Sequence, residues 1–243
     1  MKIAIIADIH ANSTALIEVL KQIRALKIHQ FIFLGDLVIN GPSPKEVLEQ
    51  IYNIRPTVWV KGNTDNWFVE IDKRWEPNSI NEIKFFELYQ FARSRLTPLD
   101  IRFINNLPIS QSIKINDVKI LCVHGSPRHI AESMSSEISD EEISEMINGV
   151  VERIILCGHS HSPTNRLIHN KYIFNPGSIS SPRDRDPRAS YGILEILDKD
   201  NIKFTIKRVP YDIDEHLKIA KKRKFPHLEE YGKKLRKATE PLL

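Results

Sequence analysis

Cysteine, glycine and long apolar runs are all scarce in this chain of 243 residues. Its two cysteines are too few for a disulfide framework, so we exclude a small disulfide-stabilised secreted domain. Nine glycines exclude a collagen-like chain. No apolar run approaches the roughly 20 residues that cross a bilayer, and the N-terminus lacks the successive segments of a signal peptide. These absences predict a soluble, cytoplasmic protein with no membrane partner.

The residues that are present are sufficient for one domain with a substantial core, because 41% of them are hydrophobic. Cys122 and Cys157 lie within apolar, strand-like runs, so we expect buried thiols rather than a disulfide or metal ligands. The net charge of +4 is uneven: residues 216–243 contain nine Lys or Arg and three Glu, which leaves the remainder at −2. Because the body of the chain is not basic, a nucleic-acid partner is disfavoured, though not excluded.

Several short apolar runs are typical of buried strands, and polar residues follow them directly. The first run, 2–7, ends on Asp8 and His10. If that strand continues, its period of two places both side chains on the same side. Helices are predicted next, with Asn12 or Ser13 as the first N-cap and Ser43 as the second. This alternation of strand and helix predicts a parallel sheet.

The rest of the chain divides into recognisable segments. Residues 66–106 are aromatic and charged, and we interpret them as a helical insert that packs over the sheet or the site. Hairpins are predicted at 112–123 and 191–209, with a capped helix between them at Ser139 and Glu142. The basic segment 210–243 is predicted to form one or two helices broken at Pro226. Exposed aromatic residues of the insert are a candidate surface for a homo-oligomer.

The polar residues at the strand ends form a set of metal-binding side chains. All of them are oxygen or nitrogen donors, namely Asp8, His10, Asp36, Asn63, His124, His159 and His161. Such donors suit Mn²⁺, Fe, Zn²⁺ or Ni²⁺ rather than a soft metal or an iron–sulfur cluster. Seven ligands are too many for one ion with open positions. They fit two ions that share a bridging carboxylate.

Five ordered motifs resemble those of the calcineurin-like metallophosphoesterases, and most of all the small bacterial and archaeal phosphodiesterases of that superfamily. The motifs are Asp8-Ile-His10, Gly35-Asp36, Gly62-Asn63-Thr64-Asp65, His124-Gly125 and Gly158-His159-Ser-His161. The resemblance extends over residues 1–209. It implies an α/β fold, a four-layer αββα sandwich of two mainly parallel or mixed sheets flanked by helices. The segment 210–243 would then be a helical extension packed on or near this domain.

The resemblance also implies a dinuclear centre. Asp8, His10 and His161 would hold one divalent ion, and Asn63, His124 and His159 the other. Asp36 would bridge the two ions, for which manganese is favoured over iron, zinc or nickel. A hydroxide shared by the ions would attack phosphorus in line on a small phosphate ester, with a phosphodiester favoured. Asp36, Asn63, Asp65 and His124 are therefore expected to be the catalytic residues, with Asp65 orienting its neighbours.

One position departs from the family pattern. The family commonly has a histidine, thought to protonate the leaving oxygen, where this chain has Thr64. Because a threonine hydroxyl is no general acid near neutral pH, we consider His129 as a substitute. Four arginines, Arg128, Arg183, Arg185 and Arg188, are candidate phosphate ligands, and we favour Arg183.

Other functions stay open. A protein phosphatase or a dinucleoside-polyphosphate hydrolase of the same superfamily would be expected to keep the missing histidine, so Thr64 counts against both. A catalytically silent metal-binding scaffold, such as the retromer subunit of this superfamily, would have eroded ligands. All seven positions here keep competent donors, which disfavours the scaffold.

Overall fold

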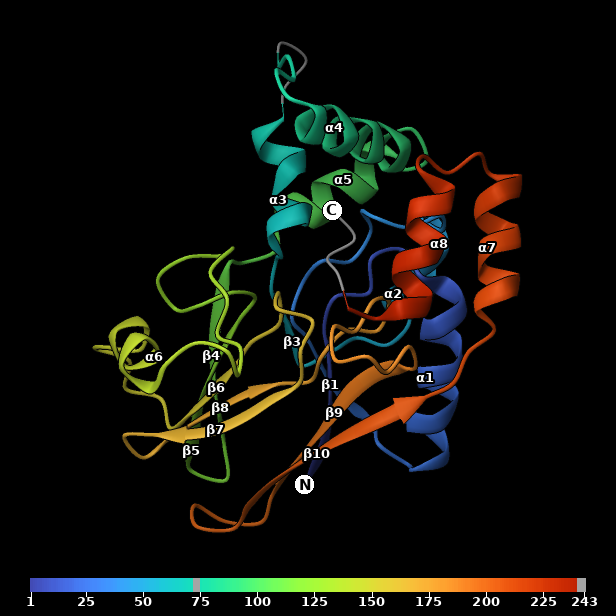
Figure 1. Cartoon of the computed structure of the whole chain (residues 1–243). Coiled ribbons are helices and arrows are strands. Elements are labelled where there is room, and N and C mark those ends of the chain that lie inside the picture. Colours follow the sequence, from blue (N-terminus) through green and yellow to red (C-terminus); the bar gives the residue numbers. More distant parts are fainter. Residues whose placement is uncertain (72–74, 240–243) are drawn as a thin grey trace.

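The computed structural model describes residues 1–71 and 75–239, which form two five-stranded sheets and eight helices (Figure 1). Sheet A has the order β10-β9-β1-β2-β3 and sheet B the order β4-β5-β6-β8-β7. The strands of sheet A are β1 (Lys2–Ile6), β2 (Gln30–Phe33), β3 (Val58–Trp59), β9 (Ala189–Ile196) and β10 (Ile202–Val209). Those of sheet B are β4 (Ser110–Ile115), β5 (Val118–Val123), β6 (Ile154–Leu156), β7 (Thr164–Ile168) and β8 (Lys171–Asn175).

Each sheet is parallel at its centre or along one side and antiparallel elsewhere. In sheet A, β1, β2 and β3 are parallel, whereas β9 is antiparallel to both of its neighbours, β1 and β10. In sheet B, β5, β6 and β8 are parallel, and the edge strands β4 and β7 are antiparallel. Six parallel strands therefore direct their carboxyl ends, three from each sheet, toward the loops that carry the candidate ligands.

The helices form the outer layers. Their bounds are α1 (Ser13–Ala25), α2 (Pro44–Tyr52), α3 (Asn63–Glu70), α4 (Ile80–Arg93), α5 (Pro98–Asn105), α6 (Asp140–Met146), α7 (Ile213–Lys222) and α8 (Leu228–Lys237). Figure 1 shows α6 beside sheet B and α1 beside sheet A, with α3, α4 and α5 gathered at one end of the molecule.

Three apolar cores separate the layers, and the alternation of side chains along each strand explains them. In β1, Ile3 and Ile5 contribute to the core between the sheets, whereas Ala4 and Ile6 face the helices over sheet A. In β6, Ile155 faces the core under α6. Both faces of these strands are buried, as near-continuous apolar runs predict. The expected αββα sandwich is thus confirmed.

Local capping sets the helix starts. Asn12 is the N-cap of α1, and its side chain accepts a hydrogen bond from Ala15 N at 3.0 Å, as expected. Ser139 and Glu142 form the predicted capping box of α6. Ser43 precedes α2, but its side chain makes no capping hydrogen bond, and Pro44 at the first helical position starts that helix.

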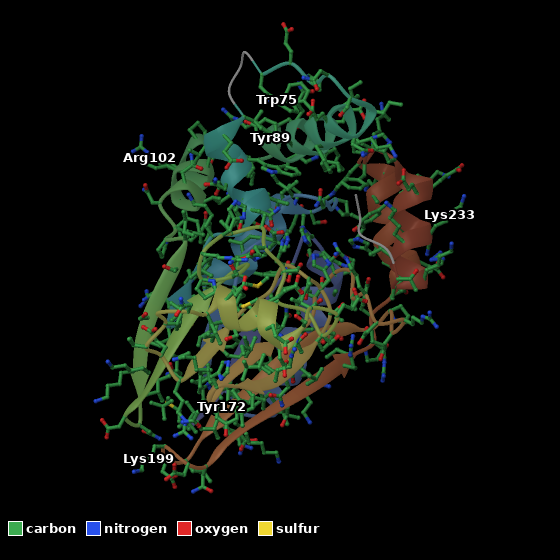
Figure 2. The ribbon with its side chains drawn as sticks, turned by 60° about the vertical axis from the view of Figure 1, so that its left-hand side comes forward. Trp75, Tyr89, Arg102, Tyr172, Lys199 and Lys233 are labelled. Atoms are coloured by element: carbon green, nitrogen blue, oxygen red, sulfur yellow. The ribbon has the colours of Figure 1, made fainter. Side chains whose placement is uncertain are left out.

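The insert and the C-terminal segment are helical and touch each other. The expected insert at 66–106 corresponds to α3, α4 and α5, although α3 begins three residues earlier, after Gly62. Phe91 of α4 packs edge-on against Phe225, with ring centroids 5.0 Å apart. Lys233 lies exposed on the outer side of α8 (Figure 2). Residues 72–74 of the insert and 240–243 of the basic segment lie outside the described residues.

The strand β7 was not expected from the sequence. It lies at the edge of sheet B, and its short, polar Thr-Asn-Arg-Leu-Ile stretch alternates in burial without an apolar run. Cys122 and Cys157 are buried free thiols, as expected. None of the helices within 1–71 and 75–239 is both long and apolar enough to cross a bilayer.

Candidate metal centre

The loops after the parallel strands bring all seven predicted donors to one region. Asp8 and His10 follow β1, Asp36 follows β2, and Asn63 follows β3. From sheet B, His124 follows β5, while His159 and His161 follow β6. Five of the seven are at most 4% exposed, namely Asp8, His10, Asp36, His124 and His161. Asn63 and His159 are half-buried and face the cavity described below.

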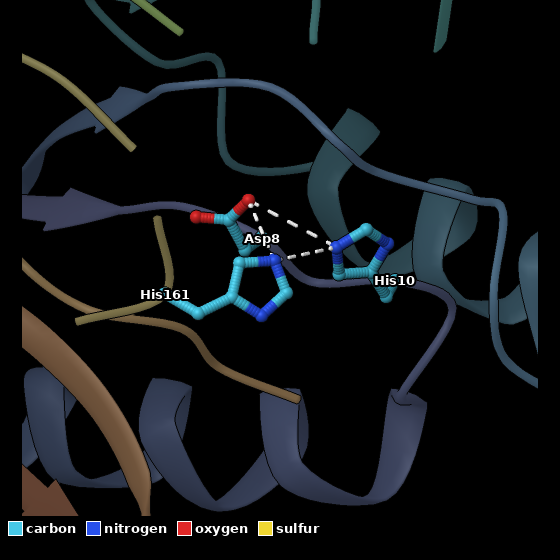
Figure 3. Close-up of side chains that lie close together, drawn as sticks. All are labelled: Asp8, His10 and His161. Atoms are coloured by element: carbon cyan, nitrogen blue, oxygen red, sulfur yellow. Dashed lines mark hydrogen bonds and ion pairs between the residues drawn. The ribbon is translucent and has the colours of Figure 1, made fainter. Parts of the chain in front are cut away.

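Asp8, His10 and His161 form the first cluster of donors (Figure 3). His161 Nε2 lies 3.1 Å from His10 Nε2 and 3.3 Å from Asp8 Oδ1. The other ring nitrogen of each histidine, Nδ1, faces a backbone carbonyl, Ile39 O at 3.0 Å and Ser181 O at 2.8 Å. A carbonyl only accepts, so each Nδ1 carries the proton and each Nε2 presents a lone pair. Two lone pairs this close repel each other unless a cation lies between them.

Asn63, His124 and His159 form the second cluster. Asn63 Oδ1 lies 3.0 Å from His124 Nε2 and 2.9 Å from His159 Nδ1. His124 Nδ1 donates to Leu34 O at 2.6 Å, so in the neutral ring Nε2 is an acceptor. That Nε2 then faces a second acceptor, the Asn63 oxygen. Either a proton on Nε2 or a cation shared by the two atoms stabilises this arrangement.

Asp36 joins the two clusters. Its Oδ2 lies 3.5 Å from His10 Nε2 and 3.4 Å from His124 Nε2. Its other oxygen, Oδ1, accepts hydrogen bonds from Thr64 N at 2.9 Å and from Thr64 Oγ1 at 2.8 Å. One oxygen is therefore held by Thr64, and the other is directed at both clusters.

Two glycines allow the loops around Asp36 to approach so closely. A Cβ on Gly62 would lie 2.1 Å from Asp36 Oδ1, so only glycine leaves room for this carboxylate. Gly35 has φ +88°, and a Cβ there would lie 2.4 Å from Gly62 N. The Gly-Asp and Gly-Asn motifs of the sequence are thus explained by the contact between the β2 and β3 loops.

The backbone at the site corrects one expectation. β1 ends at Ile6, so the strand period does not align Asp8 with His10. A left-handed backbone does so instead, with φ 54° at Asp8 and 44° at His10. Asp36, His159 and His161 share this conformation, which is uncommon for residues other than glycine. Strain of roughly 1–3 kcal/mol per residue persists where surrounding contacts enforce it, typically at functional sites.

The electrostatics of the site favour added positive charge. Burial opposes the charge of Asp36, but His124 and His10 nearby hold the pKa of this carboxyl well below its usual range. Burial lowers the pKa of His10 to about 4. Burial also acts to lower the pKa of His124, but the Asp36 carboxylate outweighs it and raises that pKa to about 10. The buried carboxylates thus attract a proton to His124, and a divalent cation would supply the same charge.

Asp8 gives a further indication that the site fits a metal cation. Its Oδ2 accepts a hydrogen bond from His159 N at 3.1 Å, but its Oδ1 is buried and, within the described chain, has no hydrogen-bond partner. An unpartnered buried carboxylate oxygen beside lone-pair nitrogens is costly unless it binds a cation. The donor set therefore fits divalent metal ions.

Asp65 lies behind the site rather than in it. Its two carboxylate oxygens accept hydrogen bonds from Leu37 N at 2.9 Å and Gly62 N at 3.0 Å. Burial, with the charge of Asp36, raises the pKa of Asp65 to about 7. These contacts join the loop after Asp36 to the turn before Asn63, consistent with the orienting role expected of Asp65.

The loop after β8 also supports the ligands. Ser178 Oγ donates to Asp8 O at 2.9 Å, and Asn175 Nδ2 donates to Ser160 Oγ at 3.0 Å, between His159 and His161. These side chains fix the backbone of both ligand loops.

A cavity of about 130 Å³ opens beside the donors. In the described chain it is lined by His10, Asp36, Asn40, Asn63, Trp67, Phe85, His159, His161 and Arg183. Arg183 was expected from the sequence. Asn40, Trp67 and Phe85 were not singled out; Trp67 and Phe85 belong to the aromatic insert, and Asn40 precedes the Gly41-Pro42 turn.

The other residues considered for substrate binding have different surroundings. Arg128 forms a two-pronged ion pair with Glu132, and Arg188 pairs with Asp186. His129 is exposed, and its Nδ1 accepts a hydrogen bond from Ala131 N at 3.2 Å in its own loop. Its role in proton donation stays a prediction.

Known proteins resemble this chain along nearly its whole length. An uncharacterized protein of Methanocaldococcus jannaschii is 30% identical over 239 residues, covering 91% of this chain and 93% of the relative. The phosphodiesterase YfcE of Escherichia coli is 21% identical over 210 residues, covering 80% of this chain and 88% of YfcE. A crystal structure of a hypothetical protein from Pyrococcus horikoshii superposes with a TM-score of 0.86 at 22% identity, covering 99% of both chains.

The family model for the calcineurin-like phosphoesterase superfamily domain matches residues 1–199, which include every candidate ligand. The buried Asp and His clusters agree with the metal dependence of that family. The chain therefore belongs to the calcineurin-like phosphoesterase superfamily, a metal-dependent family named for the hydrolysis of phosphoesters.

Proposed function

We propose that this protein is a dinuclear, metal-dependent phosphodiesterase. Asp8, His10 and His161 would hold one ion, Asn63, His124 and His159 the other, with Asp36 shared between them. The observation that carries the proposal is the position of Asp36 Oδ2, within 3.5 Å of an Nε2 atom from each cluster. Oxygen and imidazole donors suit manganese, iron, zinc and nickel, and of these we propose Mn²⁺.

The chain's own residues preorganise this site. The Nδ1–H groups of His10, His124 and His161 donate to backbone carbonyls, which fixes their rings so that each Nε2 would be available to hold an ion. Thr64 fixes Asp36, and Asp65 fixes the loops on either side. When bound, the ions would activate a water molecule and neutralise charge on the phosphoryl oxygens.

The position of Arg183 favours an anionic substrate. It lines the cavity, is half-buried, and its Nε is buried and has no hydrogen-bond partner in the described chain. Guanidinium groups bind phosphoryl oxygens through paired N–H donors. We assign Arg183 to a phosphoryl oxygen of the substrate.

The absence of a histidine at position 64 favours esters whose leaving group needs little protonation. Thr64 Oγ1 donates to Asp36, so this hydroxyl is already engaged. This favours a diester with a good leaving group and agrees with the name of the distant relative YfcE, a phosphodiesterase.

The test compares bis-p-nitrophenyl phosphate with p-nitrophenyl phosphate, using metal-stripped protein with and without added Mn²⁺. We expect faster turnover of the diester, a requirement for metal, and loss of turnover in Asp36→Asn. Asp214→Asn, which changes an exposed carboxylate on α7, is the matched control and should retain activity. Metal binding without turnover of either ester would instead indicate a catalytically silent scaffold.

A further inference from the structure

The cavity beside the candidate ligands has one wall that no metal-binding residue explains. Trp67 of α3 and Phe85 of α4 both line it, and their ring centroids are 5.5 Å apart with an interplanar angle of 51°. Both side chains are half-buried. The helical insert therefore presents a two-ring aromatic surface to the same space as the metal donors.

The position of Trp67 follows from the helix that carries it. It lies four residues after Asn63, so the two side chains share one face of α3. The next residue, Phe68, points elsewhere: it is buried and packs on Tyr89 with centroids 5.4 Å apart. Phe68 is therefore the buried core residue of α3, whereas the half-buried Trp67 packs at the edge of the same core and also borders the cavity beside Asn63.

Polar groups with unused hydrogen-bonding capacity complete the cavity. Asn40 Oδ1 is buried and has no partner in the described chain, and Asn40 has a left-handed φ of 72°. Arg183 Nε is likewise buried and without a partner there. An aromatic wall, one free acceptor and one free cationic donor together match a planar ring carried by a phosphoester.

We propose that this cavity selects phosphoesters bearing a planar aromatic ring, which stacks on Trp67 and Phe85 while the phosphoryl group lies toward Arg183. The inference rests on the proposed function, for which it names the substrate class. An aryl ester and a nucleotide base share this chemistry.

Binding of non-hydrolysable probes tests the proposal without relying on turnover. Phenylphosphonate and methylphosphonate carry the same headgroup and differ in the ring, and calorimetry on Mn²⁺-loaded protein measures both affinities. We expect phenylphosphonate to bind about tenfold tighter, as for one stacked ring. Trp67→Ala should abolish this preference, and Phe85→Ala should reduce it.

Two matched variants guard against a folding artefact. Trp67→Phe should keep most of the preference because a ring remains, and Val69→Ala, at an exposed position of the same helix, should leave it unchanged. Equal affinities in the wild type, no measurable binding of phenylphosphonate, or a preference that survives Trp67→Ala would overturn the proposal.

Binding of a nucleotide distinguishes the two possible sources of the ring, a nucleotide base and an aryl ester. Cytidine 5′-monophosphate that binds tighter than ribose 5-phosphate would identify a base, whereas equal binding of these two beside a phenylphosphonate preference would identify an aryl ester. A protein that shows the Trp67-dependent preference but hydrolyses no diester would refute the proposed function and leave the ring site standing.

Discussion

Thr64 donates two hydrogen bonds to the same oxygen of Asp36, one from its backbone N–H at 2.9 Å and one from its hydroxyl at 2.8 Å. The two residues are 28 positions apart: Asp36 lies in the loop after β2, and Thr64 lies in the first turn of α3. Where the family commonly has a histidine, this chain therefore has a residue that fixes the bridging carboxylate.

Replacing Thr64 by valine should weaken metal binding. The backbone bond to Asp36 remains, but the carboxylate loses the donor that holds its orientation, and we expect a loss of roughly tenfold in Mn²⁺ affinity. Thr64→Ser restores the hydroxyl and should bind Mn²⁺ nearly as the wild type does. Calorimetric titration of metal-stripped protein measures both, and an unchanged affinity in Thr64→Val would contradict the assignment.

Asp65→Ala should destabilise the fold as well as the site. The change leaves Leu37 N and Gly62 N without their acceptor in a buried position. Leaving buried donors unsatisfied costs about 1–3 kcal/mol each, so the two donors predict a loss of about 2–6 kcal/mol. Urea unfolding followed by circular dichroism measures it. Glu49→Ala, which removes an exposed carboxylate, is the control. Equal stabilities of the two variants would rule out this role.

The burial of His216 predicts that the folded protein loses stability in acid. It is fully buried, with Nε2 2.7 Å from Tyr231 Oη, and burial lowers the pKa of its ring to about 4. In the unfolded chain the pKa is about 6.5. Between these values the unfolded state binds a proton that the folded state excludes. The stability that the neutral, buried His216 contributes is fully present above pH 6.5. The free energy of unfolding then falls by up to about 3 kcal/mol as the pH drops toward 4.

The measurement for His216 is the free energy of unfolding against pH for the wild type and His216→Gln. Other buried histidines titrate in both proteins, so the difference between the curves isolates His216. The wild-type curve should fall more steeply between pH 6.5 and 4, and two parallel curves would contradict the explanation.

Much of the fold follows from local sequence patterns. Apolar runs identified the parallel strands of both sheets, because strands buried on both faces need apolar residues throughout. The rule that polar residues after such strands gather at one sheet edge then led to Asp8, Asp36 and His124. The structure brings these residues together as that rule predicts.

Other features depend on contacts between distant segments and leave no local pattern. The left-handed backbone at Asp8 and His10 is enforced by hydrogen bonds to the β2 loop, such as Asp8 N to Gly35 O at 3.1 Å. The pairing of Trp67 with Phe85 depends on how α3 packs against α4. Neither is visible in the periodicity of one segment.

The most direct test of the central claim is the number of metal ions that each chain binds. Metal-stripped protein is dialysed against Mn²⁺ and analysed by plasma mass spectrometry. We predict two ions per chain for the wild type, and one for His161→Ala and for Asn63→Ala, because each variant removes a ligand of a single ion. One ion or none in the wild type, with all seven donors intact, would contradict the dinuclear centre.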